Sequence, residues 1–363
     1  MRIAIVGGSI AGLHAAKYML DRGLHGIELF EKKSCFGERI ICAGGIASYM
    51  IRKTGINIPK DFIASKVSRV VFYSPSFDYA DLKLEKEYGY VLWRDKWEKW
   101  LGDEISADCK VYFKSPNPIL KGYDFIVGCD GLTGVTRTLL GLKPPSVNDI
   151  HIAIQAVAST RRVPDDAISM FFGTAVAEKG YAWAFPIGGS EFRIGLGVPL
   201  SLSRKLISSF NYLVSRLDAK LLDKPMVKMI PTAPPQESLV YGNFILVGDA
   251  GLQTDPATGG GIGNAIIGAM CAAEAISKGK IQLYDRLWRA RLYRRNKFRY
   301  GLKQILYELD NSDFEKLIDL LKDFKPISES IGAALFHLII ELALKEPKFI
   351  IKHKILRRLI KFY

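Results

Sequence analysis

The chain has 363 residues, of which 48% are hydrophobic, and a formal net charge of +14 at pH 7. The hydrophobic content is enough for a packed core, and the length suits two domains or one interleaved pair. The five cysteines include no C-x-x-C pair and the five histidines show no ligand spacing, so we expect neither a disulfide framework nor a metal site. The positive charge suits an anionic cofactor, an anionic lipid or nucleic acid. No RNA-binding motif, zinc finger or helix-turn-helix pattern is present, and nucleic acid is therefore not an expected partner.

The N-terminal segment indicates no signal peptide. Met1 leads directly into a predicted strand, without the apolar stretch and cleavage site that export requires. The longest apolar run, 331–344, contains His337 and Glu341 and is too short to span a bilayer. We therefore expect a cytoplasmic protein.

The first 31 residues have the order strand, glycine-rich turn, helix, strand, acid. A buried strand is predicted at 2–6, a helix at 13–22 and a second strand at 27–30, which Glu31 follows. In the turn, GGSIAG, Gly7 suits a tight bend and Gly12 suits close packing of helix on strand, with Ser9 at the middle glycine position. Glu31 is placed to accept from a ribose hydroxyl, so this segment predicts a dinucleotide-binding unit.

A second glycine-rich segment lies at 244–276. A predicted strand at 244–247 ends in Gly248 and Asp249, and three glycines at 259–261 precede a helix of small residues at 262–276. Glycines at a helix start leave N–H groups open to an anionic or carbonyl-bearing ligand, and Asp249 can accept from sugar-like hydroxyls. Taken alone, the segment is equally compatible with an ordinary strand–loop–helix connection.

A third signature, DGLTGVTR at 130–137, follows a predicted strand at 125–127. It is similar to the D-G-x-x-S-x-V-R motif of hydroxylase-like flavoproteins, with Gly134 and Thr136 departing from it. Asp130 alone would indicate a tight turn, and Arg137 alone a solvated charge. The three signatures stand in the order found in that family, and together they resemble its FAD-binding domain. The resemblance implies FAD as the cofactor.

Two further segments resemble the geranylgeranyl reductase family. CFGERIICAGGIASYM at 35–50 is similar to an R-x-C-x-x-G run that wraps the flavin, although Gly44 stands where the family usually has glutamate. GYAWAFP at 180–186 is similar to the Y-x-W-x-F-P motif, whereas flavin halogenases carry W-x-W-x-I-P. Tyr181, Trp183 and Phe185 alternate and so project from one face of a strand. They either pack into the core or form an apolar wall for an isoprenoid chain beside the flavin.

The resemblance implies reduction of C=C bonds in isoprenoid, geranylgeranyl-type lipid chains. An external donor, NAD(P)H or a reduced carrier, would reduce FAD, whose N5 would pass a hydride to one alkene carbon while a proton is added to the other. Cys42, Tyr181 and Trp183 would shape the catalytic pocket, and for Cys42 a buried structural thiol is the alternative. The implied FAD-contacting residues are Gly7, Gly8, Ala11, Gly12, Glu31, Cys42, Ala43, Gly45, Arg94, Val111, Asp130, Asp249, Gly260, Gly261 and Ile262.

Two alternatives share the same fold. An FAD-dependent monooxygenase would insert oxygen into an aromatic or lipid substrate, and a non-catalytic flavin electron carrier would pass electrons to a partner. Fold does not choose between them and the reductase. The Y-x-W-x-F-P motif favours the reductase. No second dinucleotide fingerprint is present, so the sequence indicates no separate NAD(P)H domain.

The expected fold class is α/β, with a Rossmann-like FAD-binding domain interleaved with a mainly antiparallel substrate domain. The first would comprise 1–65, 93–149 and 231–281, and the second 66–92 and 150–230, with strands at 66–73 and 81–92 and a helix at 200–217. A basic helical region, 282–363, would follow. Its end mixes Ile, Leu and Phe with basic residues and suits either a peripheral contact with the inner membrane face or a solvated helix; these basic residues are Lys348, Lys352, Lys354, Arg357, Arg358 and Lys361.

Overall fold

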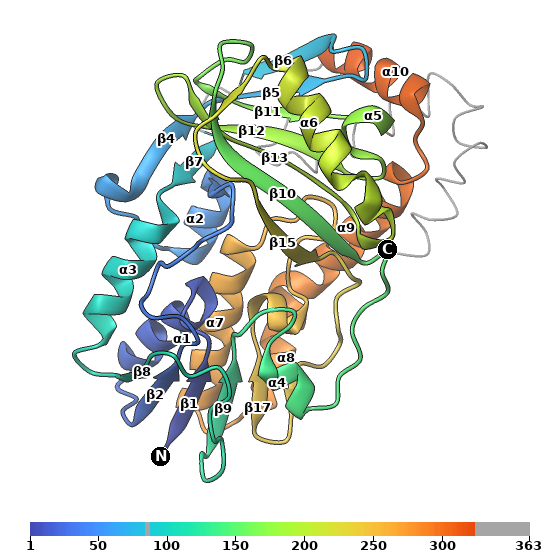
Figure 1. Ribbon diagram of the computed structural model, residues 1–363. Helices are drawn as coiled ribbons and strands as arrows, with labels where there is room; N and C mark the ends of the chain where they lie inside the picture. The colour runs from blue at the N-terminus through green and yellow to red at the C-terminus, as the bar shows by residue number, and fades with distance from the viewer. Residues whose placement is uncertain (84–87, 324–363) are drawn as a thin grey trace. The chain divides into compact units, whose positions relative to one another are not determined.

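The computed structural model describes residues 1–83 and 88–323 (Figure 1). The chain divides into two compact units, each assembled from three separate stretches of sequence. The first contains Met1–Ile40, Trp93–Ser146 and Ile230–Lys297, and the second contains, among the described residues, those of Ile41–Leu92 and Val147–Met229 together with 298–323. Residues 41–65, which we expected in the first domain, are thus grouped with the second unit. The domain bounds drawn from the sequence stay a prediction.

The first unit is built on a largely parallel sheet. Its strands, in order across the sheet, are β16 (Val240–Tyr241), β17 (Phe244–Leu246), β9 (Phe125–Gly128), β1 (Ile3–Val6), β2 (Ile27–Phe30) and β8 (Lys110–Tyr112). Only the β16–β17 pair is antiparallel among these strands. The carboxyl ends of β1, β2, β9 and β17 therefore meet at one edge of the sheet, which is where open α/β sheets bind ligands.

Two helices of the first unit that contain several small residues, α1 (Ile10–Leu20) and α7 (Ile262–Ser277), contact each other. Helix α1 also contacts α3 (Arg94–Ile105), and Figure 1 shows α1 beside α7. An ideal Cβ on Gly12 would lie 1.9 Å from the carbonyl oxygen of Gly7, so only glycine fits there. Helix α1 begins directly after Ser9, three residues before the predicted start. Shorter helices of this unit are α4 (Val135–Leu139), the 3₁₀ turn η3 (Gly248–Gly251), α8 (Leu283–Trp288) and the π-helical turn η4 (Arg289–Tyr293).

The second unit contains a larger, mainly antiparallel sheet. In order across it lie β14 (Lys220–Leu221), β10 (Ile150–Ser159), β13 (Glu191–Pro199), β12 (Tyr181–Gly188), β11 (Ala167–Phe171), β5 (Arg69–Tyr73) and β6 (Tyr79–Lys83), with β15 (Met226–Pro231) also paired to β10. The β11–β5 pair is parallel, whereas β10–β13, β13–β12, β12–β11 and β5–β6 are antiparallel. Residues of successive strands therefore line up in rows across the sheet.

One face of this sheet carries the core of the second unit. Ile154, Ala184 and Leu196 lie on that face and pack against Phe210 and Leu213 of α6 (Leu206–Arg216). The alternate residues of the same strands project from the opposite face. The helix expected at 200–217 is divided: a 3₁₀ turn, η2 (Leu200–Lys205), precedes α6, because the backbone at Leu202 is not helical.

A small antiparallel sheet completes the second unit. It consists of β3 (Gly45–Ala47), β7 (Gly89–Leu92) and β4 (Ile63–Val67). The single strand expected at 66–73 is wrong, because β4 ends at Val67 in this sheet whereas β5 begins at Arg69 in the larger one. The strand expected at 81–92 is likewise divided between β6 and β7, and residues 84–87 lie outside the described part. The remaining elements are α2 (Ser48–Thr54), η1 (Lys60–Phe62), α5 (Thr174–Ala177), α9 (Arg294–Leu306) and α10 (Asn311–Lys322).

This arrangement confirms the predicted fold class, a parallel-sheet α/β unit interleaved with a mainly antiparallel one and followed by helices. The basic segment with Lys348 to Lys361 lies outside the described residues. Among residues 1–83 and 88–323, no helix has the length and hydropathy needed to cross a membrane.

Candidate functional site

The turn after β1 is held in shape by Glu31. Gly7 has φ +102°, and an ideal Cβ there would lie 2.5 Å from the carbonyl oxygen of Cys129, so the position requires glycine. The N–H of Gly8 donates to Oε2 of Glu31 at 2.6 Å, and the N–H of Lys33 donates to Oε1 at 2.9 Å. The carboxylate is buried at the carboxyl end of β2. Glu31 therefore lies beside the glycine turn, as the sequence pattern predicts.

Ser9 directs its side chain away from the start of α1. Its hydroxyl donates to Oε2 of Glu98 at 2.7 Å, and Nη2 of Arg94 donates to the same hydroxyl at 3.3 Å. Arg94 and Glu98 are both buried and form an ion pair one helical turn apart on α3. Ser9 makes no side-chain cap to α1, whose first N–H groups can therefore meet an anionic ligand. Sequence reasoning missed Glu98, although its i,i+4 spacing from Arg94 was a signal.

The two glycine-rich turns of the first unit meet at Gly248. An ideal Cβ on Gly248 would lie 3.2 Å from the Cβ of Ala11 and 3.6 Å from the Cβ of Ala265, so the first turns of α1 and α7 lie side by side. Asp249 accepts from the hydroxyl of Thr254 at 2.9 Å. Its Oδ1 would also lie 3.6 Å from an ideal Cβ on Gly261, the residue that precedes α7.

The loop before α7 is fixed by amide side chains that sequence reasoning missed. Gln253 accepts from the N–H of Gly248 at 2.7 Å and donates to the hydroxyl of Tyr284 at 2.9 Å. Its backbone carbonyl accepts from Asn264 at 2.7 Å and from Asn296 at 3.0 Å. No motif points to these residues, and two of the partners, Tyr284 and Asn296, lie 31 and 43 residues from Gln253 along the chain.

The DGLTGVTR segment is tied into the same edge of the sheet. Asp130 accepts from the N–H of Thr136 at 2.8 Å and from its hydroxyl, and burial raises the pKa of the Asp130 carboxyl. An ideal Cβ on Gly134 would lie 2.1 Å from Cγ of Asp130, which explains the glycine at this departure from the motif. Arg137 is buried and donates to the carbonyl oxygens of Ala250 at 2.8 Å and Lys143 at 3.0 Å. It is therefore not the solvated charge that the residue alone would indicate.

The remaining predicted residues of the first unit occupy less constrained positions. Val111 lies in β8 and pairs in register with Leu29 of β2. Gly260 is exposed, and its N–H donates to the hydroxyl of Thr258 at 3.3 Å. Ile262 is buried and begins α7.

In the second unit, an aromatic row stands on the sheet face opposite the α6 core. Tyr181, Trp183 and Phe185 alternate along β12, whereas Ala182 and Ala184 between them belong to the core. The rings of Tyr181 and Trp183 have centroids 5.8 Å apart. Trp183 is 8% exposed, and the other two are half-buried. The aromatic row is thus not part of the core that packs on α6.

The Trp183 indole lies over the neighbouring strand because that strand has a glycine there. Gly195 of β13 pairs with Trp183 on one side and with Gln155 of β10 on the other. An ideal Cβ on Gly195 would lie 2.6 Å from Cζ2 of Trp183, so a side chain there would displace the ring. Across Gly195, Nε1 of Trp183 donates to Oε1 of Gln155 at 3.3 Å.

The segment 42–45 lies on this same face. Gln155 Nε2 donates to the carbonyl oxygen of Cys42 at 3.3 Å, and Nη1 of Arg193 donates to that of Ala43 at 3.0 Å. An ideal Cβ on Gly45 would lie 2.5 Å from the Phe185 ring. Gly44, where the family usually has glutamate, has φ +83° and leaves room for the Arg193 guanidinium, which an ideal Cβ would approach to 2.4 Å.

Comparison with known proteins shows similarity to geranylgeranyl reductases. Residues 149–233, which carry the aromatic row, match the family model described as the geranylgeranyl reductase catalytic domain. The chain is 28% identical over 362 residues to the digeranylgeranylglycerophospholipid reductase of Methanothrix thermoacetophila, covering 87% of this chain and 90% of that one. It is 25% identical to a geranylgeranyl bacteriochlorophyll reductase-like protein of Thermoplasma acidophilum, whose crystal structure matches with a TM-score of 0.89 over 100% of this chain and 99% of that one. The chain is thus similar, over most of its length, to members of the geranylgeranyl reductase family.

The fold is also shared with more distant flavoproteins. A variant of HpxO from Klebsiella pneumoniae, solved in complex with FAD, has 17% identity and a TM-score of 0.67, covering 96% of this chain and 99% of that one. At this identity the likeness concerns the fold alone.

The predicted site residues fall into two groups, one in each unit. The glycine turns, Glu31, Arg94, Asp130 and Asp249 gather at the carboxyl edge of the parallel sheet, and Cys42, Ala43 and Gly45 lie on the aromatic face with Tyr181 and Trp183. Gln155 and Arg193, which anchor the second group, were not predicted. The available signal was a polar side chain between apolar neighbours in a strand: Gln155 lies between Ile154 and Ala156, and Arg193 lies between Phe192 and Ile194.

Proposed function

We propose that this protein hydrogenates carbon–carbon double bonds in geranylgeranyl-type isoprenoid lipid chains. It is an FAD-dependent oxidoreductase similar to members of the geranylgeranyl reductase family, and reduction of an isoprenoid lipid is the activity named for its digeranylgeranylglycerophospholipid reductase relatives. The observation that carries the proposal is the aromatic row Tyr181–Trp183–Phe185, which stands on the sheet face away from the core and against the Cys42 segment.

The first unit fits the cofactor. The side chain of Ser9 does not cap α1, and Gly261 before α7 has no side chain that could cap it. The first N–H groups of both helices can therefore donate to a pyrophosphate or a flavin carbonyl. Glu31 directly follows β2, the position from which an acid accepts from a ribose hydroxyl in dinucleotide-binding units. The residues that we propose to contact FAD are those implied by the family resemblance: Gly7, Gly8, Ala11, Gly12, Glu31, Cys42, Ala43, Gly45, Arg94, Val111, Asp130, Asp249, Gly260, Gly261 and Ile262.

The chemistry divides between cofactor and chain. FAD, when bound and reduced by NAD(P)H or a reduced carrier, supplies a hydride from N5 to one alkene carbon. An isolated alkene accepts hydride poorly, so the chain must hold it in a dry and closely aligned pocket. Tyr181, Trp183 and Phe185 provide apolar surface that excludes water. The second alkene carbon takes one proton, for which the thiol of Cys42 and the hydroxyl of Tyr181 are the candidate donors that we propose.

Anaerobic turnover tests the proposed function. The purified protein, loaded with FAD and reduced with dithionite, is mixed with a geranylgeranyl lipid in the absence of oxygen, and the products are analysed by mass spectrometry. We expect a mass increase of about two units for each double bond reduced. A product formed only when oxygen is admitted, and carrying an added oxygen atom, would identify a monooxygenase. Flavin that reduces and reoxidises with no lipid product would identify an electron carrier.

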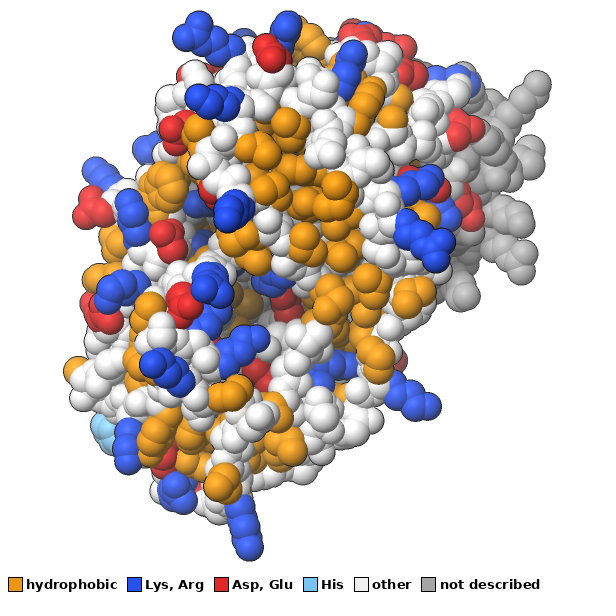
Figure 2. Space-filling model, viewed as in Figure 1, with side chains coloured by type: hydrophobic (Ala, Val, Ile, Leu, Met, Phe, Trp, Pro, Cys, Tyr) orange, Lys and Arg blue, Asp and Glu red, His pale blue; other side chains and the backbone are white. Residues whose placement is uncertain are grey.

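We also propose a peripheral contact with an anionic membrane, which would bring the protein to its lipid substrate. The basic C-terminal segment suggested by the sequence lies outside the described residues, but a second surface has similar chemistry. Figure 2 shows hydrophobic side chains gathered where Figure 1 draws α6, β10 and β15. The exposed large hydrophobic side chains on α6, β14, β15 and the turn between these two strands are Ile207, Tyr212, Leu221, Leu222, Val227 and Met229.

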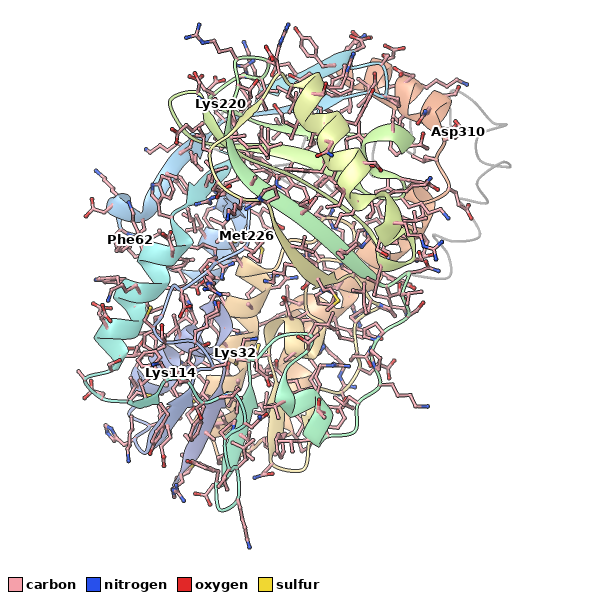
Figure 3. All side chains as sticks on the ribbon, viewed as in Figure 1. Lys32, Phe62, Lys114, Lys220, Met226 and Asp310 are labelled. Carbon is pink, nitrogen blue, oxygen red and sulfur yellow. The ribbon has the colours of Figure 1, made fainter. Side chains whose placement is uncertain are left out.

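The turn between β14 and β15 adds positive charge to these apolar side chains. Lys220 begins β14 and Met226 begins β15, as Figure 3 labels them. Lys224 of this turn, Lys220 of β14 and Lys228 of β15 are exposed, whereas the acid of the turn, Asp223, accepts from the N–H of Val157 at 2.7 Å. Lysines beside apolar side chains suit an interface with anionic headgroups.

A further inference from the structure

Gln155 is a polar side chain in an apolar setting, and both ends of its amide are used. It is 6% exposed, within the strand IHIAIQAVAS. Its Oε1 accepts from Nε1 of Trp183 at 3.3 Å, and its Nε2 donates to the carbonyl oxygen of Cys42 at 3.3 Å. One side chain therefore links the aromatic row to the segment that carries Cys42.

The chemistry of the two partners fixes the orientation of the amide. An indole N–H can only donate, and a backbone carbonyl can only accept. The carbonyl end of Gln155 must consequently face Trp183 while its amino end faces Cys42. A flipped amide would bring two donors together on one side and two acceptors on the other.

The path between Gln155 and Trp183 is kept open by Gly195. Gln155, Gly195 and Trp183 occupy one row across β10, β13 and β12. Because Gly195 has no side chain, the indole crosses the middle strand and reaches the amide on the next one.

We propose that Gln155 is a positioning residue for alkene reduction, acting through Trp183 and Cys42. By holding the indole plane and the Cys42 backbone together, it keeps both at the spacing that the reaction uses. This inference rests on the proposed roles of Cys42 and Trp183. Gln155 itself need not touch substrate or cofactor.

Arg193 anchors the same segment independently, which makes the proposal testable in folded protein. Its Nη1 donates to the carbonyl oxygens of Ala43 at 3.0 Å and Leu92 at 2.9 Å. Loss of the Gln155 amide therefore leaves the segment attached to the sheet next to Cys42. We expect Gln155 variants to fold and to bind FAD.

Two substitutions separate the two hydrogen bonds. Gln155→Glu retains an acceptor for Trp183 but places an oxygen against the carbonyl of Cys42. Gln155→Met is similar in length and removes both hydrogen bonds. Ser169→Ala serves as the control, because Ser169 is a buried polar residue of the same sheet that pairs with Ala184 on the opposite, α6-facing side.

Alkylation of Cys42 reports on the position of its segment without any need for activity. Arg39 separates Cys35 and Cys42 into different tryptic peptides, so exposed Cys35 is an internal reference. We expect both Gln155 variants to raise the rate ratio of Cys42 to Cys35 alkylation about fivefold, the size expected for one lost buried hydrogen bond. Trp183 fluorescence, taken as the difference from the corresponding Trp183→Phe proteins, should change in Gln155→Met but not in Gln155→Glu. Ser169→Ala should match the wild type in both measurements.

Kinetics complete the test. We expect kcat for the prenyl lipid to fall about tenfold in Gln155→Met, since misplacement and not lost binding is the cause, with KM within about twofold of the wild type. The inference that Gln155 positions Cys42 and Trp183 would be overturned if Gln155→Met had the same Cys42 to Cys35 alkylation ratio and the same Trp183 fluorescence as the wild type, whatever its activity. A wild-type protein that reduces no prenyl alkene would overturn the proposed function instead, while the thiol and fluorescence readouts would still test the link made by Gln155.

Discussion

The guanidinium of Arg137 donates from Nη1 to the carbonyl oxygen of Ala250, 2.8 Å away, and from Nη2 to that of Lys143 at 3.0 Å. Ala250 lies in η3, between Asp249 and Gly251. Through this contact the segment that begins at Asp130 supports the turn that leads to α7. The planar guanidinium donates to both carbonyls at once from two nitrogens, which the single ammonium group of a lysine cannot do in the same geometry.

We expect Arg137→Lys to destabilise the first unit and weaken FAD binding. Loss of one charged hydrogen bond in a buried setting costs about 2 kcal/mol of unfolding free energy. Urea denaturation and flavin titration measure the two effects. Arg286→Lys, at an exposed arginine of α8, is the matched control and should leave both unchanged. Equal stability of the two variants would show that the Arg137 contacts contribute nothing.

A methyl group at Gly12 should be far more disruptive than one at Gly197. The ideal Cβ of Gly12 would lie 1.9 Å from the backbone oxygen of Gly7, whereas that of Gly197 would lie no closer than 3.7 Å to its nearest neighbour, the Cβ of Ala153. We expect Gly12→Ala to lower the unfolding free energy by about 3 kcal/mol or more, and Gly197→Ala by less than about 1 kcal/mol. Thermal denaturation distinguishes them. Similar melting temperatures would contradict the close packing of α1 on the turn.

Stability should fall in mild acid because His151 resists protonation. Burial, together with the charge of Lys303, lowers the pKa of His151 to about 3. The unfolded chain, with an ordinary histidine pKa near 6.5, binds a proton between these values that the folded protein does not. Unfolding free energy therefore decreases as pH drops from about 6.5 towards 3, by up to about 1.4 kcal/mol per pH unit for one group.

His151→Phe should flatten this pH dependence. The variant also loses the contact of His151 Nε2 with the Tyr307 hydroxyl at 3.0 Å, but that loss shifts the stability curve without changing its slope over this range. His14, whose pKa burial lowers to about 4, retains its own contribution. The unfolding free energies of the wild type and of His151→Phe are measured between pH 4 and 7. Parallel dependence on pH in the two proteins would contradict the role given to His151.

Vesicle binding should depend on the turn between β14 and β15. Leu222 and Val227 are each 46% exposed. We expect the double variant Leu222→Ser with Val227→Ser to reduce cosedimentation with anionic vesicles about tenfold, since two apolar side chains no longer enter the interface. Ile119→Ser, at a side chain 84% exposed in the first unit, controls for general loss of surface hydrophobicity. An equal loss of vesicle binding in the double variant and in Ile119→Ser would show that the membrane contact does not depend on Leu222 and Val227.

Local pattern predicted most elements of the first unit because their signals lie within a few residues. The strand at 27–30 is found as predicted, and α7 begins at Ile262 as expected. The strand expected at 66–73 was wrong because both halves alternate well, and only pairing partners distant in sequence assign Val67 and Arg69 to different sheets.

The supports of the candidate site were harder to predict than the motifs. Gly7, Gly12 and Glu31 follow a spacing imposed by one continuous turn, whereas Glu98 and Gln155 act through partners on other elements. A single sequence shows that such residues are polar but not what they contact. The roles proposed for the FAD-contacting and catalytic residues stay predictions.

The contact of α1 with α7 also has a consequence for biosynthesis. Helix α1 ends at Leu20 and its partner begins at Ile262. At about 5–20 residues per second, a ribosome needs roughly 10–50 s to make the intervening chain. During that interval the apolar side of α1 has no α7 to pack against, so we expect chaperones to bind the nascent N-terminal segment. We also expect the first unit to complete its folding late, after α7 has been synthesised.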